Sequence, residues 1–82
     1  MTYRTMRVLG VIKWLPGASN REVADRAGVR DQGQISKLLS RLSALGLIEN
    51  ASRDPSAHAR NAWRLTAAGS AAYHIHKHQR RS

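Results

Sequence analysis

The fold is decided between residues 19 and 46, where the chain reads SNREVADRAGVRDQGQISKLLSRLSALG. Ser19 and Glu22 form a capping box, in which the serine hydroxyl accepts from the Glu22 amide and the Glu22 carboxylate reaches back. Gly28 ends the helix that begins there, because glycine tolerates the left-handed conformation that follows a helix. We therefore predict a short helix over residues 19–28, too short to be stable without neighbours.

A second helix is predicted over residues 31–46, with Asp31 as its N-cap and Gly46 at its end. Five apolar side chains recur along it at helical spacing: Ile35, Leu38, Leu39, Leu42 and Leu45. This is the clearest amphipathic pattern in the chain. Two helices joined by a tight connection, the second of them amphipathic, predict a helix-turn-helix.

Further elements are predicted on both sides of this motif. Residues 1–15 predict a first helix, since apolar side chains recur at helical spacing before Pro16 stops it: Val8, Val11, Ile12 and Leu15. Residues 47–65 predict a hairpin, in which two short strands flank a loop rich in turn-forming residues and Trp63 and Leu65 share one face.

The chain is predicted to end in a last helix and a basic tail. Thr66 begins a helix over residues 66–78, with a thin apolar stripe formed by Ala68, Ala71, Ala72 and Ile75. Residues 79–82 form the tail. The predicted fold class is mainly α with a small β-hairpin wing: a winged helix-turn-helix in a single domain over residues 1–82, with a three-helical core and a C-terminal helix.

Length and charge limit the function. The chain has 82 residues, 14 Lys and Arg against 5 Asp and Glu, a net charge of +9 and no cysteine. So small a domain has little room for a walled catalytic pocket, and its excess of cations is typical of a protein that binds a polyanion. Without cysteine, neither a disulfide framework nor a Cys-based zinc site is possible.

Five segments together resemble a known family: residues 19–24, 27–29, 34–42, 45–49 and 63–69. Their pattern is similar to the winged helix-turn-helix of MarR-like transcriptional regulators, and the resemblance covers roughly residues 7–72. It implies a DNA-binding domain of a bacterial-type regulator. Full MarR-like regulators are longer and carry terminal helices that make a dimer, so this chain looks like a module appended to a larger regulator or a minimal version.

The polar side of the helix at 31–46 is predicted to face DNA bases, because it is small, basic and free of acids. Its candidate contacts are Gln32, Gln34, Ser36, Lys37, Ser40 and Arg41. Glutamine can pair with adenine, and lysine or arginine with guanine. The alternative interpretation is an ordinary solvated helix face.

Phosphate contacts are predicted from cations beside these helices. Arg21 lies in the first helical turn after Ser19, and Arg30 precedes the helix at 31–46; helix N-termini attract phosphate. For Ser19 itself, we favour plain capping. At the hairpin tip, Arg53 and Arg60 are expected at the backbone or in the minor groove, with His58 a weaker candidate.

A second apolar stripe runs along the first helix through Tyr3, Met6, Gly10 and Trp14. One interpretation is internal packing, with Trp14 under the last helix. The other is a partner surface, which would serve a homodimer or attachment to a larger regulator. The sequence leaves the two interpretations open.

The function predicted from the sequence is sequence-specific binding of double-stranded DNA by a transcriptional regulator, normally through two copies on neighbouring half-sites. The alternatives are a winged protein–protein interaction module and a non-specific DNA or RNA binder. For RNA, Trp63 is the one aromatic expected on a strand. We expect no catalytic residues, no cofactor, no metal and no membrane segment, and a cytoplasmic location; His74 and His78 share a helix face but lack further ligands.

Overall fold

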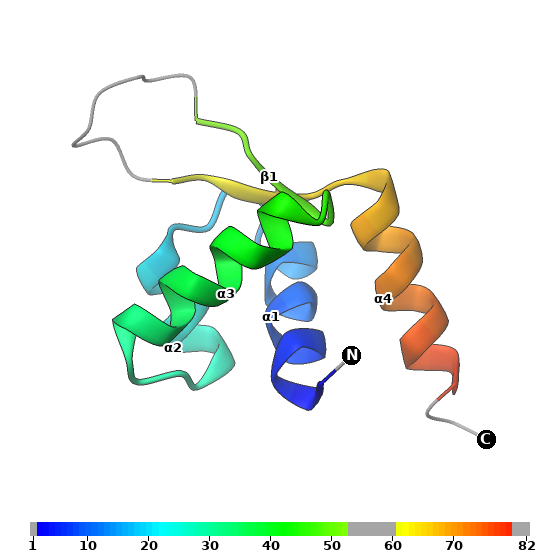
Figure 1. The fold of residues 1–82 in the computed structure, drawn as a ribbon, viewed down its shortest axis with the longest axis horizontal. Helices are drawn as coiled ribbons and strands as arrows, with labels where there is room; N and C mark the ends of the chain where they lie inside the picture. The colour runs from blue at the N-terminus through cyan, green and yellow to red at the C-terminus, as the bar shows by residue number, and fades with distance from the viewer. Residues whose placement is uncertain (1, 53–60, 80–82) are drawn as a thin grey trace.

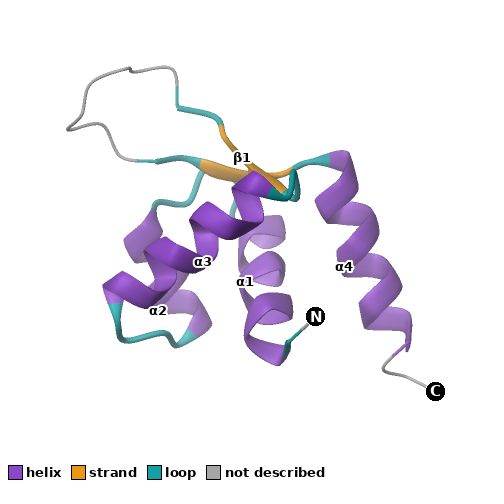
Figure 2. Ribbon diagram, in the orientation of Figure 1, coloured by secondary structure: helices purple, strands orange, loops and turns teal. Residues whose placement is uncertain are grey.

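A computed structural model describes residues 2–52 and 61–79. In this part of the chain the elements are α1 (Tyr3–Trp14), α2 (Asn20–Ala27), α3 (Gln32–Ala44), β1 (Ile48–Asn50), β2 (Trp63–Leu65) and α4 (Ala67–Gln79). Figure 1 shows α3 lying across the front of α1 and α2, the hairpin along one edge of the helices, and α4 on the far side of α1. Figure 2 shows the same arrangement by element type. The winged helix-turn-helix expected from the sequence is confirmed, and helix ends differ from the expected ones by one or two residues.

The local signals that start and stop the central helices act as the sequence predicts. Ser19 and Glu22 form the capping box, with both reciprocal hydrogen bonds present. Gly28 follows α2 in the left-handed conformation, with φ of 74°. The Asp31 carboxylate accepts from the backbone amides of Gly33 and Gln34 at the start of α3. These caps satisfy amides that have no partner within their helices.

The core lies where α1, α2 and α3 meet beneath the hairpin. Its fully buried side chains of largest volume are Leu9, Ile12, Ile35, Leu39, Ile48, Val8 and Val23. Of the predicted stripe on α3, Ile35, Leu39 and Leu42 are buried and Leu38 is half-buried, whereas Leu45 is 63% exposed. Leu45 is the C-cap residue of α3, and the chain turns away at Gly46, whose φ is 77°. Helical spacing therefore stops predicting burial where the helix stops.

The hairpin is antiparallel and pairs Ile48 with Leu65, Glu49 with Arg64, and Asn50 with Trp63. As alternation predicts, Trp63 and Arg64 lie on opposite faces of β2: Trp63 is buried and Arg64 is exposed. The loop between α1 and α2 adds to the far side of β2: the Gly17 amide donates to the Trp63 carbonyl, and the Trp63 amide donates to the Ala18 carbonyl. Strand β2 is therefore held by backbone hydrogen bonds on both of its edges.

Helix α4 packs on a different face from the predicted one. Of the predicted stripe, Ala68, Ala71 and Ile75 are exposed and only Ala72 is half-buried. Gly69, by contrast, is buried, and Tyr73 is half-buried against the core. A Cβ atom at Gly69 would lie 1.8 Å from the Leu47 carbonyl oxygen, so α4 meets the start of the hairpin backbone to backbone. The predicted stripe is wrong for three of its four residues, because α4 approaches the start of the hairpin through a glycine that has no side chain rather than through an apolar stripe.

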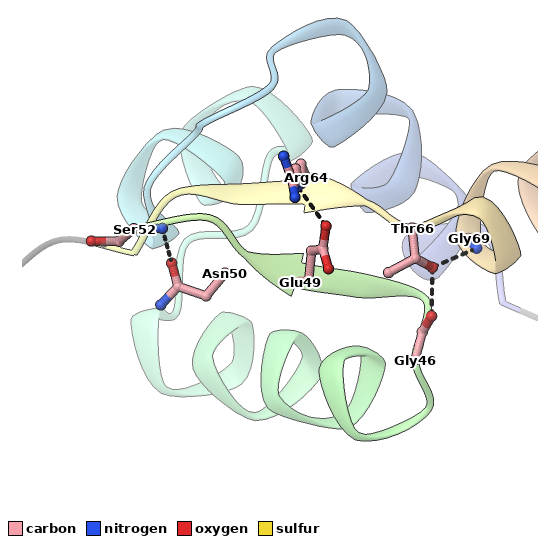
Figure 3. Close-up of polar contacts among 7 residues, drawn as sticks. All are labelled: Gly46, Glu49, Asn50, Ser52, Arg64, Thr66 and Gly69. Carbon is pink, nitrogen blue, oxygen red and sulfur yellow. Dashed lines mark hydrogen bonds and ion pairs between the residues drawn. The ribbon is translucent and has the colours of Figure 1, made fainter. Parts of the chain in front are cut away.

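Two hydrogen bonds of Thr66 fix this junction, and Figure 3 shows them. The Thr66 hydroxyl donates to the Gly46 carbonyl and accepts from the Gly69 amide.

In the described part of the chain, no helix is long and apolar enough to cross a membrane.

Candidate nucleic-acid interface

The polar face of α3 is exposed along its whole length. Every candidate base contact on it is exposed: Gln32, Gln34, Ser36, Lys37, Ser40 and Arg41. The helix contains no acidic residue, and its cations are Lys37 and Arg41. Gly33 and Ala44 are also exposed, and their lack of large side chains keeps the face free of bulk. The surface can therefore approach a polyanion closely without like-charge repulsion.

The polar face of α3 has two edges, one beside α2 and the other beside α1. On the edge beside α2, the side-chain nitrogen of Asn20 donates to the Ser36 hydroxyl at 3.4 Å. On the edge beside α1, the Arg4 guanidinium donates to the Gln34 carboxamide oxygen at 3.0 Å. Arg41 lies on this second edge, in a groove that Leu38, Leu45, Leu47 and His76 help to line. Helical spacing of about 100° per residue places Lys37 and Ser40 between these two edges, at the centre of the exposed face.

Arg4 is a residue that the sequence analysis missed. It precedes Gln34 by 30 positions and lies in the first turn of α1. Only the packing of α1 against the helix-turn-helix brings its charge to the start of α3. No local pattern in the sequence could have indicated that contact.

The predicted phosphate contacts lie around the start of α2 and the turn before α3. Arg21 and Gln32 share an open groove with two carboxylates, Glu22 and Asp25. Arg30 is exposed in the connection between α2 and α3. Each arginine has an acidic neighbour: Arg21 shares its groove with two carboxylates, and Arg30 directly precedes Asp31, the N-cap of α3. Ser19 is buried and caps α2.

The three hairpin candidates, Arg53, His58 and Arg60, lie outside the described residues. The structure does place Trp63, which is 7% exposed and donates its indole N–H to the Asn20 carboxamide oxygen at 2.6 Å. Its ring is therefore not an exposed platform on which a base could stack. The interpretation that Trp63 stacks on RNA bases is therefore wrong, because the residue belongs to the core.

The apolar stripe on α1 is half covered. Met6 is buried, and Gly10 lies against the ring of Tyr73 on α4. The expectation that Trp14 packs beneath the last helix is wrong, since Trp14 is 75% exposed. Tyr3 is 62% exposed. Within the described residues, no group of three His, Asp or Glu side chains is placed to hold a metal ion.

Three helices pack around one core, the polar face of α3 is exposed, and an antiparallel hairpin lies at one edge. This arrangement defines a winged helix-turn-helix domain. No family model and no curated protein matches the chain. Solved structures do. The PcaV transcriptional regulator from Streptomyces coelicolor, in complex with its natural ligand, matches with a TM-score of 0.78 at 32% identity, over 90% of this chain and 51% of that chain.

Two further structures agree. The transcriptional repressor CouR, bound to a 23-mer DNA duplex, matches with a TM-score of 0.81 at 26% identity, over 94% of this chain and 53% of that one. MarR from E. coli, at 24% identity, has the same fold, with a TM-score of 0.79 over 92% of this chain and 54% of that one. The chain is a MarR-like winged helix. It spans about half the length of the solved structures it matches.

Proposed function

We propose that this chain is the DNA-binding domain of a transcriptional regulator, and that α3 enters the major groove of double-stranded DNA. The observation that carries the proposal is the exposed, acid-free face of α3, with Lys37 at its centre. A net charge of +9 supports a polyanionic partner. CouR, a similar structure, is a repressor bound to a DNA duplex.

Within this proposal, the residues have different roles. Lys37 and Ser40 face base edges, and Gln32 and Gln34 contact them from the first turn of α3. Arg30 and Arg21 bind phosphates. From the sequence we also expect Arg41 to face bases beside Lys37 and Ser36 to contact the DNA, and we expect Arg53 and Arg60 to contact the backbone or minor groove.

The test is a titration of backbone amide NMR signals with a 20-base-pair duplex at two salt concentrations. We expect shifts at residues 19–21 and 30–41 that fade as salt rises, because phosphate contacts release counterions. The alternative, a winged module that binds only proteins, predicts no shifts there even at low salt. Equal affinity for duplexes of unrelated sequence would favour the non-specific binder and would remove sequence specificity from the proposal.

A matched pair of variants assigns the face. Lys37→Ala and Lys77→Ala each remove one positive charge, the first from α3 and the second from an exposed position on α4. We expect the first to weaken duplex binding about tenfold, and the second about twofold or less. Equal losses would mean that the charge as a whole, not α3, binds the duplex.

For α1, we propose that Tyr3 and Trp14 contact a partner, either a second copy of the chain or the rest of a larger regulator. Their exposure supports this role. Sedimentation of the wild type and of Trp14→Glu distinguishes the two partners. Self-association that the variant abolishes indicates a second copy, whereas a monomer at high concentration excludes it.

A further inference from the structure

Three asparagines, the only ones in the chain, connect the hairpin to α2 and α3. The Asn50 side-chain nitrogen donates to the Asn61 carboxamide oxygen at 2.8 Å. The Asn61 nitrogen donates to the Asn20 oxygen at 3.1 Å. The Asn20 nitrogen donates to the Ser36 hydroxyl at 3.4 Å. We call this series, from Asn50 through Asn61 and Asn20 to Ser36, the amide relay.

Groups that can only donate set the direction of the relay. The Asn50 oxygen accepts from the backbone amides of Ser52 and Ala62, each at 3.0 Å, so its nitrogen must point to Asn61. The Asn20 oxygen accepts from the Trp63 indole N–H at 2.6 Å, so its nitrogen must point to Ser36. Asn61 then has one orientation that satisfies both neighbours. No carboxamide in the relay can be flipped without bringing donor against donor.

The relay acts on a part of the hairpin that the core does not hold. Trp63 is buried, and the backbone at Ala18 already pairs with it. Asn50, by contrast, is exposed, and Asn61 and Asn20 are half-buried. Hydrogen bonds between exposed or half-buried side chains each add little to stability. Their geometric effect is larger, because they join the outer end of the hairpin to a side chain on the polar face of α3.

We propose that Asn20 is a positioning residue that fixes the outer end of the hairpin relative to α3. It is the one relay residue that contacts both, through Asn61 and Trp63 on one side and Ser36 on the other. The inference rests on the proposed function: a rigid angle between hairpin and α3 lets both elements engage one duplex in a single register.

The first test uses the protein without DNA and reads the Ser36 and Lys37 backbone amides by NMR. Asn61→Ala cuts the relay two links away from α3, so we expect both amides to shift. Glu49→Gln is the matched control, because it weakens a cross-strand pair in the same hairpin that has no link to the relay. It should leave both amides unchanged. Unshifted Ser36 and Lys37 amides in Asn61→Ala would overturn the proposal.

A second background guards against a general disturbance of the fold. Ser36→Ala removes the last link and places a better helix former in α3, so it should fold. In that background, Asn61→Ala should no longer shift the amides at positions 36 and 37. If the same shifts persist, they do not travel through the relay and the proposal fails.

The last arm adds the 20-base-pair duplex. We expect Asn61→Ala to lose about fivefold in affinity, whereas Ser70→Ala, which removes a neutral polar group from α4, loses less than twofold. Unchanged affinity in Asn61→Ala, with the amide shifts present, would mean that the relay exists but does not serve binding. Failure of the wild type to bind the duplex would overturn the proposed function itself, a result that the DNA-free arms do not depend on.

Discussion

The inner end of the hairpin meets α4 backbone to backbone, at Leu47 and Gly69, whereas the outer end meets α2 through the side chains of Asn50, Asn61 and Asn20. The first junction needs the absence of a side chain, and the second needs three particular ones. A contact between backbones leaves no room for adjustment, whereas side-chain amides can give way at modest cost. The comparison implies that the inner end holds the fold and the outer end sets an angle.

The largest expected effect comes from Gly69→Ala, which attacks the inner end. Alanine usually stabilises a helix relative to glycine, but here its Cβ would lie 1.8 Å from the Leu47 carbonyl oxygen. We expect unfolding to become easier by about 3 kcal/mol, with a Tm lower by about 15 °C. Thermal unfolding followed by circular dichroism measures this. A stabilised variant would show that α4 does not dock through Gly69.

The next effect tests the outer end. Trp63→Phe keeps a buried ring but removes the indole N–H that donates to Asn20. We expect a loss of about 1.5 kcal/mol in chemical denaturation, from one hydrogen bond and a smaller ring. Trp14→Phe, at an exposed ring, should change stability by less than about 0.5 kcal/mol. Equal losses from the two variants would contradict the different burial of these residues.

The next variant, Thr66→Val, tests the hydrogen bonds at the inner end of the hairpin. Valine keeps the shape of threonine but loses the hydroxyl that caps Gly69 and donates to Gly46. The expected cost is about 1 kcal/mol, typical of a lost helix cap. Thr66→Ser retains the hydroxyl and should recover most of that stability. If serine does not rescue, the methyl group rather than the cap is what holds the junction.

The smallest effect is expected between the two ends, where Glu49 pairs with Arg64 on the exposed side of the hairpin (Figure 3). Glu49→Gln should cost about 0.5 kcal/mol or less, since solvent and salt screen an exposed ion pair. Repeating the unfolding measurement at high salt should shrink even that difference. A loss above 1 kcal/mol would place an important anchor at the middle of the hairpin.

The features that could be predicted from the sequence are those set by neighbours along the chain. The Ser19–Glu22 capping box and Gly28 depend on residues within one helical turn, and both are present in the structure. The winged helix-turn-helix follows from such local signals. The exposure of the α3 face also follows, because amphipathic spacing fixes which side chains turn away from the core.

The features that could not be predicted depend on contacts between distant segments. Asn20 and Asn61 are 41 positions apart, and nothing beside either residue indicates the other. Glycine within a helix normally lowers its stability, yet Gly69 lets the backbone of α4 approach the Leu47 carbonyl. Alternation places Trp63 on one face of its strand but does not say whether that face is buried, and only the packing of β2 against the helices settles that it is.

The contrast between the two tryptophans gives the molecule a pair of built-in optical reporters. Trp63 is shielded beneath the hairpin and bonded to Asn20, whereas Trp14 is open to solvent, with the Lys13 ammonium 5.5 Å from its ring centre. A dissolved anionic quencher such as iodide is drawn to the second indole and kept from the first. Residual fluorescence under quenching therefore comes from the hairpin, and the quenched fraction comes from α1. A change in one component identifies which surface a partner occupies, with no label attached to the protein.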